Sequence, residues 1–368
     1  MPRVHRSGMS SDERAAYKAE MKRTRKQCLF HRPVEHIDLS RTRTVGELVH
    51  AFGEGSFQSR NLGECARIFL KMVEDPEAVI YLGLAGALIA GGMRRVICDL
   101  LRHNLADVVV STGANIYHDI FEARGHRHYR YVPGADDYDL EIMDVDRVYD
   151  TLVDDDLFAQ LAYDLADEFI PALEERPYSS REFLERLGLA FEDEECFVAA
   201  AARLGKPLFS PSIVDSGLGM ALARHGQKRP GSSFRLDLVR DNLEFARLHL
   251  ATHATGGIYL GGGVPKNYIQ SAQPLLEVMG HAIHAHKYAI QLTTDDPKWG
   301  GLSGCTLKES VSWGKYEHEG ALGTAYVDVT IGLPLIAAYV LEHRGAVEAR
   351  KPRRFRWDEE GCVRLEIG

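Results

Sequence analysis

The chain has 368 residues and a mass of 41.1 kDa, with 45% hydrophobic and 26% charged residues, which is typical of a globular protein with a sizeable core. Its 44 basic and 53 acidic residues give a net charge of −9, and this acidic balance argues against a nucleic-acid partner. The sequence has no apolar run of membrane-spanning length, no signal sequence and no Cys-x-x-Cys pair. We therefore expect a cytoplasmic protein without a membrane segment or a structural zinc site.

Residues 1–35 are predicted to form a basic arm ahead of the folded part. Residues 1–32 contain nine Lys or Arg and three acidic residues. The segment 10–27 predicts a short helix capped by Ser11. A mobile extension is the simpler interpretation of this arm, and docking to a partner is the alternative.

Residues 36–345 are predicted to form a single α/β domain. Helical periodicity covers 45–52 and 61–75, and buried strands are expected at 78–84 and near 108–111, each followed by a small-residue turn and a helix. A strand, a glycine turn and a helix return at 256–280, another strand is expected at 287–294, and a strand followed by a helix is expected at 321–344. This rhythm predicts a doubly wound, mostly parallel sheet with helices on both faces, in which ligands bind at the carboxyl ends of the strands.

The segments between and after these units are less regular. Residues 134–158 are acidic and are expected to form a solvated, loop-like insertion. Helices are predicted at 157–176, 180–189 and 235–250. Residues 346–368 are expected to form a tail that resembles a β-hairpin, turning at Glu359, Glu360 and Gly361.

Two turns after predicted strands are candidates for nucleotide binding. Gly261, Gly262 and Gly263 precede a helix, and such a turn brings backbone N–H groups close to a pyrophosphate. Lys266 takes the place of the third glycine of the usual motif, so a purely structural turn is the alternative. Asp215 follows another predicted strand, where it would either bind a ribose or cap the next helix.

Three histidines lie close together at His281, His284 and His286. Their spacing does not place them on one helical face, and no acidic residue or cysteine accompanies them at ligand spacing. We therefore predict no metal site and interpret them as a solvated helix end.

The stretch ESVSWGKY at 309–316 places a lysine next to a tryptophan. A lysine forms a Schiff base only as a neutral amine, which requires desolvation or a neighbouring cation. Trp313 would provide an apolar wall and a cation–π face, and Glu309 would hold an ammonium group. From the pattern alone, a surface charge is the simpler interpretation of Lys315, and catalysis is the alternative.

Taken together, these motifs resemble the deoxyhypusine synthase family over roughly residues 36–345. The most specific match is the Glu-x-x-Ser-Trp-Gly-Lys signature at 309–315, supported by the segments 56–63, 103–112, 209–219 and 257–266 in the family's order. The resemblance implies an NAD-binding fold in a homotetramer with sites at subunit interfaces. It also implies transfer of an aminobutyl group from spermidine, through an imine on Lys315, to an acceptor amine. In deoxyhypusine synthase that acceptor is a lysine of a translation factor, and in homospermidine synthases it is putrescine.

The resemblance also implies roles for individual residues. Lys315 would be the imine-forming nucleophile, and Trp313, Glu309 and Asn267 would line the amine pocket. NAD would contact Thr112, Gly113, Asp215, Gly262, Gly263, Thr294, Ser303 and Asp328.

The chain departs from the family pattern around this pocket. Two carboxylates that hold the amines of spermidine correspond to Met220 and Leu302, a histidine corresponds to Asn267, and a glutamate corresponds to His118. On the NAD side, an aspartate becomes Trp299, and two polar contacts become Ala87 and Ala90. His118 would replace the lost glutamate as a proton acceptor, or it would be a hydrogen-bonded turn residue.

These departures predict retained imine chemistry with a changed substrate. We expect an NAD-dependent alkylamine transferase, for example of the homospermidine synthase type. The alternatives are an NAD-binding pseudoenzyme with a regulatory role and an authentic deoxyhypusine synthase.

Overall fold

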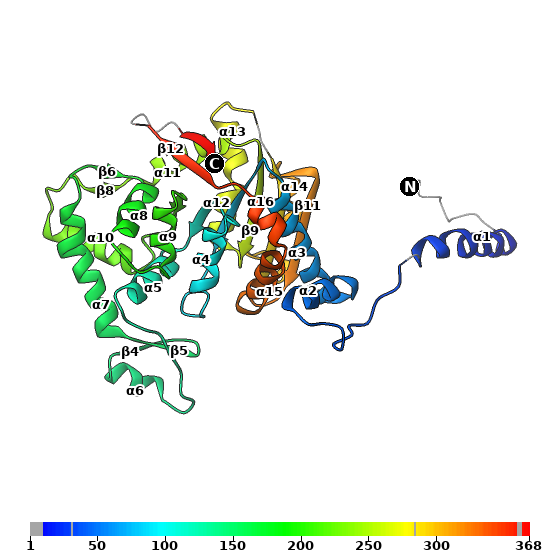
Figure 1. Ribbon diagram of the computed structural model, residues 1–368, viewed down its shortest axis with the longest axis horizontal. Helices are drawn as coiled ribbons and strands as arrows, with labels where there is room; N and C mark the ends of the chain where they lie inside the picture. The colour runs from blue at the N-terminus through cyan, green and yellow to red at the C-terminus, as the bar shows by residue number, and fades with distance from the viewer. Residues whose placement is uncertain (1–9, 31, 283–284, 359–362) are drawn as a thin grey trace.

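The computed structural model describes residues 10–30, 32–282, 285–358 and 363–368. Its centre is a six-stranded sheet in which every neighbouring pair of strands is parallel, so the predicted doubly wound α/β fold is confirmed (Figure 1). The strands lie in the order β11 (Tyr316–Tyr326), β10 (His286–Thr293), β9 (Ala254–Leu260), β1 (Ala78–Leu84), β2 (Val108–Ser111) and β7 (Leu208–Phe209).

The strand order reverses beside β1. The chain passes from β1 to β2 and β7 on one side, and β9, β10 and β11 then extend the sheet on the other side. Such a reversal leaves a crevice at the carboxyl ends of the strands, because the connections leave in opposite directions. The crevice therefore lies between the ends of β1 and β9.

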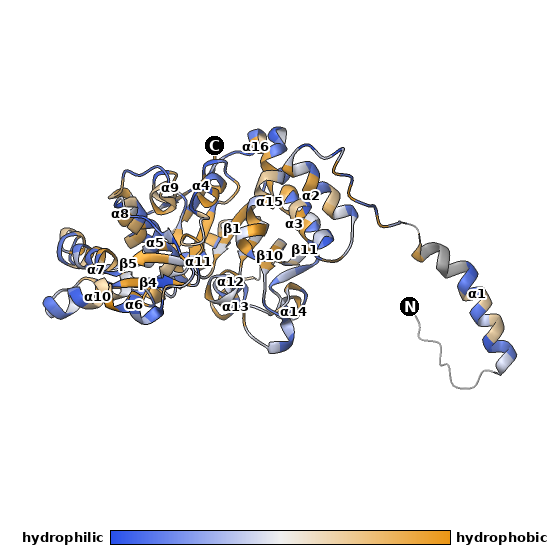
Figure 2. Cartoon of the chain, turned by 90° about the horizontal axis from the view of Figure 1, so that it is seen from below, coloured by the Kyte–Doolittle hydropathy of each residue, from blue (hydrophilic) through white to orange (hydrophobic). Residues whose placement is uncertain are grey.

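Helices cover both faces of the sheet because alternate residues of the strands point to opposite faces. In β1, Ile80 and Leu82 belong to one hydrophobic cluster, whereas Val79 and Tyr81 belong to the other. Figure 2 shows the two helical layers on either side of β1 and β10. The first cluster includes side chains of α2 (Val45–Glu54), α3 (Phe57–Glu74), α4 (Arg94–Arg102), α5 (Gly113–Ala123) and α15 (Val329–Glu342). The second includes side chains of α11 (Leu238–Leu250), α12 (Gly263–Gln270), α13 (Ala272–Val278) and α14 (Leu307–Val311).

A second group of elements lies beside β7. Residues 157–176, predicted as one helix, begin within the α-helix Asp155–Asp164 and continue as a π-helical turn at Leu165–Phe169 and a 3-10 turn at Ile170–Ala172 that contains Pro171. Residues 235–236, predicted as helical, pair with Pro177–Tyr178 as a short parallel strand. The elements of this group are α7 (Asp155–Asp164), β6 (Pro177–Tyr178), α8 (Ser180–Leu189), α9 (Phe197–Arg203), α10 (Gly217–Lys228) and β8 (Arg235–Leu236).

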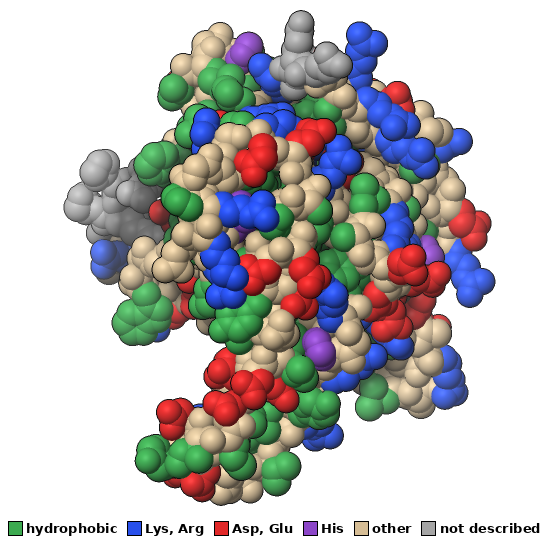
Figure 3. Space-filling view, turned by 90° about the vertical axis from the view of Figure 1, so that its left-hand side faces the viewer, with side chains coloured by type: hydrophobic (Ala, Val, Ile, Leu, Met, Phe, Trp, Pro, Cys, Tyr) green, Lys and Arg blue, Asp and Glu red, His purple; other side chains and the backbone are tan. Residues whose placement is uncertain are grey.

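The acidic insertion is folded, so the prediction of a loop at 134–158 was wrong. It contains α6 (Asp137–Ile142), β4 (Val145–Val148) and β5 (Thr151–Asp154), and β3 (Tyr129–Arg130) completes a three-stranded antiparallel sheet. We call residues 134–156 the acidic lobe. Figure 3 shows it projecting from the body, with acidic and hydrophobic side chains side by side.

The two ends of the chain differ. α1 (Ser11–Leu29) stands away from the body, and Ser10, rather than the predicted Ser11, caps it by accepting a hydrogen bond from the backbone N–H of Glu13. Within the predicted tail, residues 346–349 belong to α16 (Arg344–Ala349). The antiparallel strands β12 (Arg353–Trp357) and β13 (Val363–Ile367) follow, and the predicted turn at 359–361 lies outside the described residues.

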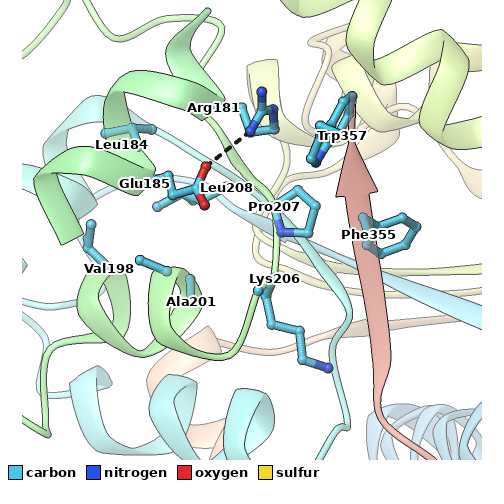
Figure 4. A pocket seen from close by; sticks show the side chains of 12 residues that line it. Arg181, Leu184, Glu185, Val198, Ala201, Lys206, Pro207, Leu208, Phe355 and Trp357 are labelled. Atoms are coloured by element: carbon cyan, nitrogen blue, oxygen red, sulfur yellow. Dashed lines mark hydrogen bonds and ion pairs between the residues drawn. The ribbon is translucent and has the colours of Figure 1, made fainter. Parts of the chain in front are cut away.

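The C-terminal strands are fastened to the body by buried contacts. The Arg350 guanidinium donates to the Asp107 carboxylate at 2.6 Å, with both side chains fully buried. Figure 4 shows Trp357 and Phe355 of β12 lining a pocket against α8 and α9, where the Arg181 guanidinium lies 4.2 Å from the centre of the Trp357 ring. In the part of the chain that the structure describes, no helix is long and apolar enough to cross a membrane.

Candidate functional site

A pocket opens at the carboxyl ends of four neighbouring strands, in the crevice where the strand order reverses. Its volume is about 620 Å³, with the adjoining open solvent included. Its walls follow β1, β9, β10 and β11 directly, which is the position expected for a nucleotide in a doubly wound sheet. The lining residues are Ala85, Gly86, Leu88, Leu260, Gly261, Gly262, Thr293, Thr294, Asp295, Ser303, Val327, Asp328 and Val329.

The glycine turn forms one wall of this pocket. A Cβ atom on Gly262 would lie 2.4 Å from the Cα atom of Ser303, so only glycine fits there. Gly261 and Gly263 have φ angles of +79° and +62°, a backbone region that favours glycine. α12 begins at Gly263, and its free N–H groups and partial positive charge are therefore available to an anionic group in the pocket.

Half of the eight predicted NAD contacts line the pocket, namely Gly262, Thr294, Ser303 and Asp328. Thr294 and Asp328 are exposed at its rim, and Asp328 also caps α15 by accepting a hydrogen bond from the backbone N–H of Thr330 at 2.8 Å. Carboxylates at such a rim suit the hydroxyl groups of a ribose. The strand ends, the glycine turn and the rim carboxylates fit a dinucleotide.

The remaining predicted contacts lie next to the pocket, at the ends of β2, β7 and β9. Thr112 donates a hydrogen bond of 2.7 Å to the carbonyl of Gly86, which lines the pocket. Gly113 packs against Ser216, so the loop that carries Asp215 lies alongside the start of α5. Asp215 is exposed, and the N-cap residue of α10 is Ser216. The alternative interpretation of Asp215 as a helix cap was therefore wrong.

The lysine motif is shaped by a capped helix and a glycine. The Thr306 hydroxyl accepts a hydrogen bond from the backbone N–H of Glu309 at 3.0 Å and so starts α14. Gly314 has a φ angle of +69°, which reverses the chain after that helix. The Lys315 carbonyl then accepts a hydrogen bond of 3.1 Å from the backbone N–H of His286 at the start of β10. These contacts fix the backbone from which the lysine side chain extends.

The Lys315 side chain is half-buried and lies next to α12, which carries Asn267. Its Nζ atom is 3.5 Å from the Asn267 Oδ1 atom and 5.8 Å from the centre of the Trp313 ring. Burial lowers the pKa of Lys315 below its ordinary value. The structure thus brings together three of the predicted residues and favours the neutral amine that imine formation needs.

Glu309 and Trp313 are exposed on the segment that leads into this lysine. The Trp313 side chain has 69% of its surface exposed. Among the described residues, no basic side chain lies within ion-pair distance of the Glu309 carboxylate. Both groups are therefore open to a cationic ligand.

His118 is buried on α5, in contact with another histidine. Its Nδ1 atom lies 2.8 Å from the Nε2 atom of His128, whose Nδ1 atom lies 2.7 Å from Glu122. Phe158 packs against the ring at a centroid distance of 5.1 Å. Burial lowers the pKa of His118 to about 4, and the charge of His128 acts in the same direction. His118 is therefore neutral at pH 7.

Lys315 and His118 do not meet within one copy of the chain. α5 follows β2, and Lys315 precedes β11, which is four strands away in the sheet. At about 4.8 Å between neighbouring strands, that separation is roughly 19 Å. A proton-accepting role for His118 at Lys315 stays a prediction, and it needs a site completed by another copy.

Two buried residues beside the lysine were not predicted as site residues. Lys266 donates to the Gln291 Oε1 atom at 3.0 Å and to the carbonyl of Cys305. Gln291 donates in turn to the carbonyls of Gly261 and Ser303 at 3.0 and 2.9 Å, which joins Lys266 to the pocket wall. The sequence held one signal: a lysine in the first turn of a helix opposes the helix dipole, so another contact must hold it.

Other predicted features are placed as follows. Met220, Leu302 and Trp299, where the resemblance implies that carboxylates are lost, are all exposed. His286 is buried in β10 against the Thr255 hydroxyl at 2.7 Å, so its interpretation as part of a solvated helix end was wrong. His281 is exposed, and His284 lies outside the described residues. Among the described side chains, no group of three potential metal ligands occurs.

Comparisons with known proteins agree with this geometry. The family model for deoxyhypusine synthase matches residues 47–340. The chain is 38% identical over 340 residues to the "Deoxyhypusine synthase-like protein" of Coxiella burnetii, covering 90% of this chain and 94% of that one. It is also 38% identical over 341 residues to the "Probable deoxyhypusine synthase 2" of Methanosarcina mazei, covering 91% and 96%. In fold, it is similar to the solved structure of a "putative deoxyhypusine synthase" from Entamoeba histolytica, with a TM-score of 0.57, 17% identity and coverage of 84% and 97%.

Proposed function

This chain belongs to the deoxyhypusine synthase family, and we propose that it is an NAD-dependent alkylamine transferase that works through an imine on Lys315. The observation that carries the proposal is the setting of Lys315. Its amine is half-buried beneath α12, next to Asn267 and Trp313, and burial lowers its pKa. Gly262, the N-cap residue of α12, also lines the pocket.

The pocket at the strand ends is the proposed cofactor site. Gly262, Ser303 and the N-terminus of α12 would hold the pyrophosphate, and Asp328 at the rim would hold a ribose. When bound, NAD accepts a hydride from the carbon beside the donor's amine and returns it at the end, so the reaction is redox-neutral.

Lys315 would carry the transferred group. Its neutral amine adds to the carbon of the donor's imine, and the donor's amine leaves with the proton that Lys315 gives up. The carbon chain then remains on Lys315 as an imine. An acceptor amine adds to the same carbon, and Lys315 departs as a free amine, which restores the starting state.

The surroundings of Lys315 support an amine substrate with few cationic centres. Trp313 offers an open aromatic face within cation–π range, and the Glu309 carboxylate is exposed near it. Met220 and Leu302 supply no charge where the family pattern has two carboxylates, and a buried ammonium without a carboxylate is costly. Because those carboxylates hold the amines of spermidine in the family pattern, their loss disfavours an authentic deoxyhypusine synthase, and we propose transfer between small amines of the homospermidine synthase type instead.

Exposed aromatic residues near the lysine support an assembly. Trp299 has 76% of its surface exposed, and Leu302 and Trp313 are also exposed within the same short stretch of chain. Apolar surface gathered in this way marks an interface on soluble proteins. A homotetramer with sites between subunits would cover these residues and would bring Lys315 near the residues at the ends of β2 and β7.

A trapping experiment tests the proposed function. The protein is incubated with NAD and with spermidine, putrescine or agmatine, then treated with borohydride, which reduces an imine to a stable secondary amine. Intact mass and peptide mapping should find the adduct on Lys315 and should find none in Lys315→Arg. If NAD binds but no amine leaves an adduct, the chain is an NAD-binding regulatory protein instead. Transfer to a lysine of a translation factor, rather than to putrescine, would identify an authentic deoxyhypusine synthase.

A further inference from the structure

The helix α1 packs against nothing in its own copy of the chain. It stands away from the body (Figure 1), and none of its side chains that the structure describes is buried. Helices in proteins draw most of their stability from the elements that they pack against, because an isolated helix is marginal in water. A helix of 19 residues in this position therefore calls for a partner outside its own copy.

One face of α1 carries a row of positive charges. Arg14, Lys18 and Lys22 follow one another at a spacing of four residues, which places them on the same side of the helix, and all three are exposed. Like charges at this spacing destabilise an isolated helix. Among the described residues, no carboxylate lies within ion-pair distance of these three side chains. A negatively charged partner would offset the repulsion and stabilise the helix.

The acidic lobe carries a surface of the opposite charge. A concavity of about 830 Å³, with the adjoining open solvent included, lies against α6 and β4. Arg147 forms an ion pair with Asp137 at 2.6 Å, and within the described chain the other carboxylates of the concavity have no ion pair. The lining residues are Asp137, Leu140, Glu141, Asp144, Val145, Asp146, Arg147 and Asp155.

The carboxylates of this concavity lie close enough to repel one another. Burial and the neighbouring carboxylate of Asp146 raise the pKa of Asp155, and Asp144 acts in the same direction. α6 also exposes Tyr138 and Ile142, and Figure 3 shows acidic and hydrophobic side chains side by side on the lobe. A basic helix bound here would relieve the repulsion and cover apolar surface.

The lobe that faces α1 belongs to a second copy. The chain after α1 is held at the end of α2, where the Glu35 backbone N–H donates to the Glu54 carbonyl at 3.1 Å and the Arg32 guanidinium pairs with the Glu54 carboxylate. In Figures 1 and 2, α1 and α2 lie toward one end of the molecule and the acidic lobe lies toward the other, so α1 points away from the lobe of its own copy.

We propose that α1 of one copy binds the concavity of the acidic lobe on a second copy, with Arg14, Lys18 and Lys22 against the carboxylates. This contact goes beyond the proposed function, because neither surface includes Lys315 or a residue of the nucleotide pocket. The combined surface stays negative, since residues 134–156 hold ten acidic and one basic residue and residues 1–32 hold three acidic and nine basic ones.

Carbodiimide coupling of the full-length protein tests this contact without NAD or an amine substrate. The reagent joins a lysine amine to a nearby carboxylate as an amide, and it takes up the water that is lost and becomes a urea. At micromolar protein concentration and low salt, a denaturing gel should show covalent dimers. Peptide mapping of these dimers should join Lys18 or Lys22 to Glu141 or Asp146. Salt at about 0.5 M should lower the yield, because exposed charges are then screened.

A charge exchange between the two surfaces gives the decisive comparison. Lys18→Glu with Lys22→Glu reverses the arm, and Glu141→Lys with Asp146→Lys reverses the lobe. Each pair of changes should lower the yield of cross-links between residues 10–30 and 134–156 in the covalent dimer about tenfold. All four changes together should restore the yield, with the introduced lysines of the lobe joined to the introduced glutamates of the arm.

A control and three outcomes decide the proposal. Glu77→Lys with Glu192→Lys reverses two exposed carboxylates of the body and should cross-link like the native protein. Circular dichroism checks that each variant is folded. The proposal is overturned if the fourfold variant does not regain the cross-link, if α1 joins the lobe only within single chains, or if native α1 joins carboxylates outside residues 134–156 instead.

Discussion

Gly262 and Ser303 approach so closely that a methyl group on Gly262 would lie 2.4 Å from the Cα atom of Ser303. This contact sets the shape of the pocket wall. Gly262→Ala should therefore push the two loops apart and weaken NAD binding at least tenfold, as measured by calorimetric titration.

A matched control lies on α10. A methyl group on Gly226 would meet no atom within 4 Å, so Gly226→Ala should leave NAD affinity unchanged. It should also raise the free energy of unfolding by about 0.5–1 kcal/mol, because alanine favours a helix interior. Native affinity in Gly262→Ala would mean that the cofactor binds elsewhere.

Trp313 is predicted to act on substrate binding. Its ring lies 5.8 Å from the Lys315 amine and is open to solvent, so Trp313→Leu should remove a cation–π contact worth about 0.5–2 kcal/mol. KM for the amine donor should rise about 2- to 30-fold, with a smaller change in kcat. Tyr149→Leu, at an exposed aromatic residue of the acidic lobe, is the control, and equal effects of the two changes would contradict the role of Trp313.

The exposed aromatic residues predict a stable assembly. Sedimentation at micromolar protein concentration should give a mass of about four chains of 41.1 kDa. Trp299→Lys should shift the mass toward smaller species, because a buried unpaired ammonium group disfavours an interface. A single chain at the same concentration would remove the support for a site shared between subunits.

The Asp107–Arg350 pair is predicted to dominate the anchoring of the C-terminal segment. Arg350→Met should lower the free energy of unfolding by about 3–5 kcal/mol, since it leaves the fully buried Asp107 without its closest partner. Arg356→Met removes an exposed pair with Glu366 in the same hairpin and should cost less than about 0.5 kcal/mol. Urea unfolding measures both, and equal losses would refute the ranking.

The lowered pKa of His118 predicts that the free energy of unfolding depends on pH. Its folded pKa is about 4, below the ordinary value, so the unfolded chain binds a proton first as the pH falls. The stabilisation that this histidine contributes is complete above about pH 6.5 and is lost between there and about pH 4, by roughly 3 kcal/mol. His118→Gln should flatten the fall in melting temperature within this window, and an unchanged slope would assign the effect to other groups.

The sequence predicted the central sheet because its strands are buried on both faces. Runs such as residues 78–84 and 254–260 are apolar or small throughout, which is the pattern of a parallel strand under two layers of helices. The acidic lobe was missed for the opposite reason. Its strands Val145–Val148 and Thr151–Asp154 are short and have little buried surface, and pairing rather than burial makes them strands.

Some residues of the candidate site can likewise be identified from the sequence, whereas others can be identified only from the fold. Lys315, Trp313 and Glu309 belong to one continuous motif, so the sequence was enough to single them out. Lys266 owes its burial and its partners to Gln291 and Cys305, which are 25 and 39 residues away along the chain. Only the fold brings these residues together.

The acidic lobe also determines how the molecule carries its charge. Residues 134–156 contain ten of the 53 acidic residues and one of the 44 basic ones, so the remainder of the chain holds 43 of each. The entire formal charge of −9 thus sits on a small projection, while the enzyme-like body is electrically balanced. Like-charged projections repel one another, and such repulsion keeps concentrated protein from precipitating. In this chain the colloidal solubility of a neutral body is supplied by one appended lobe.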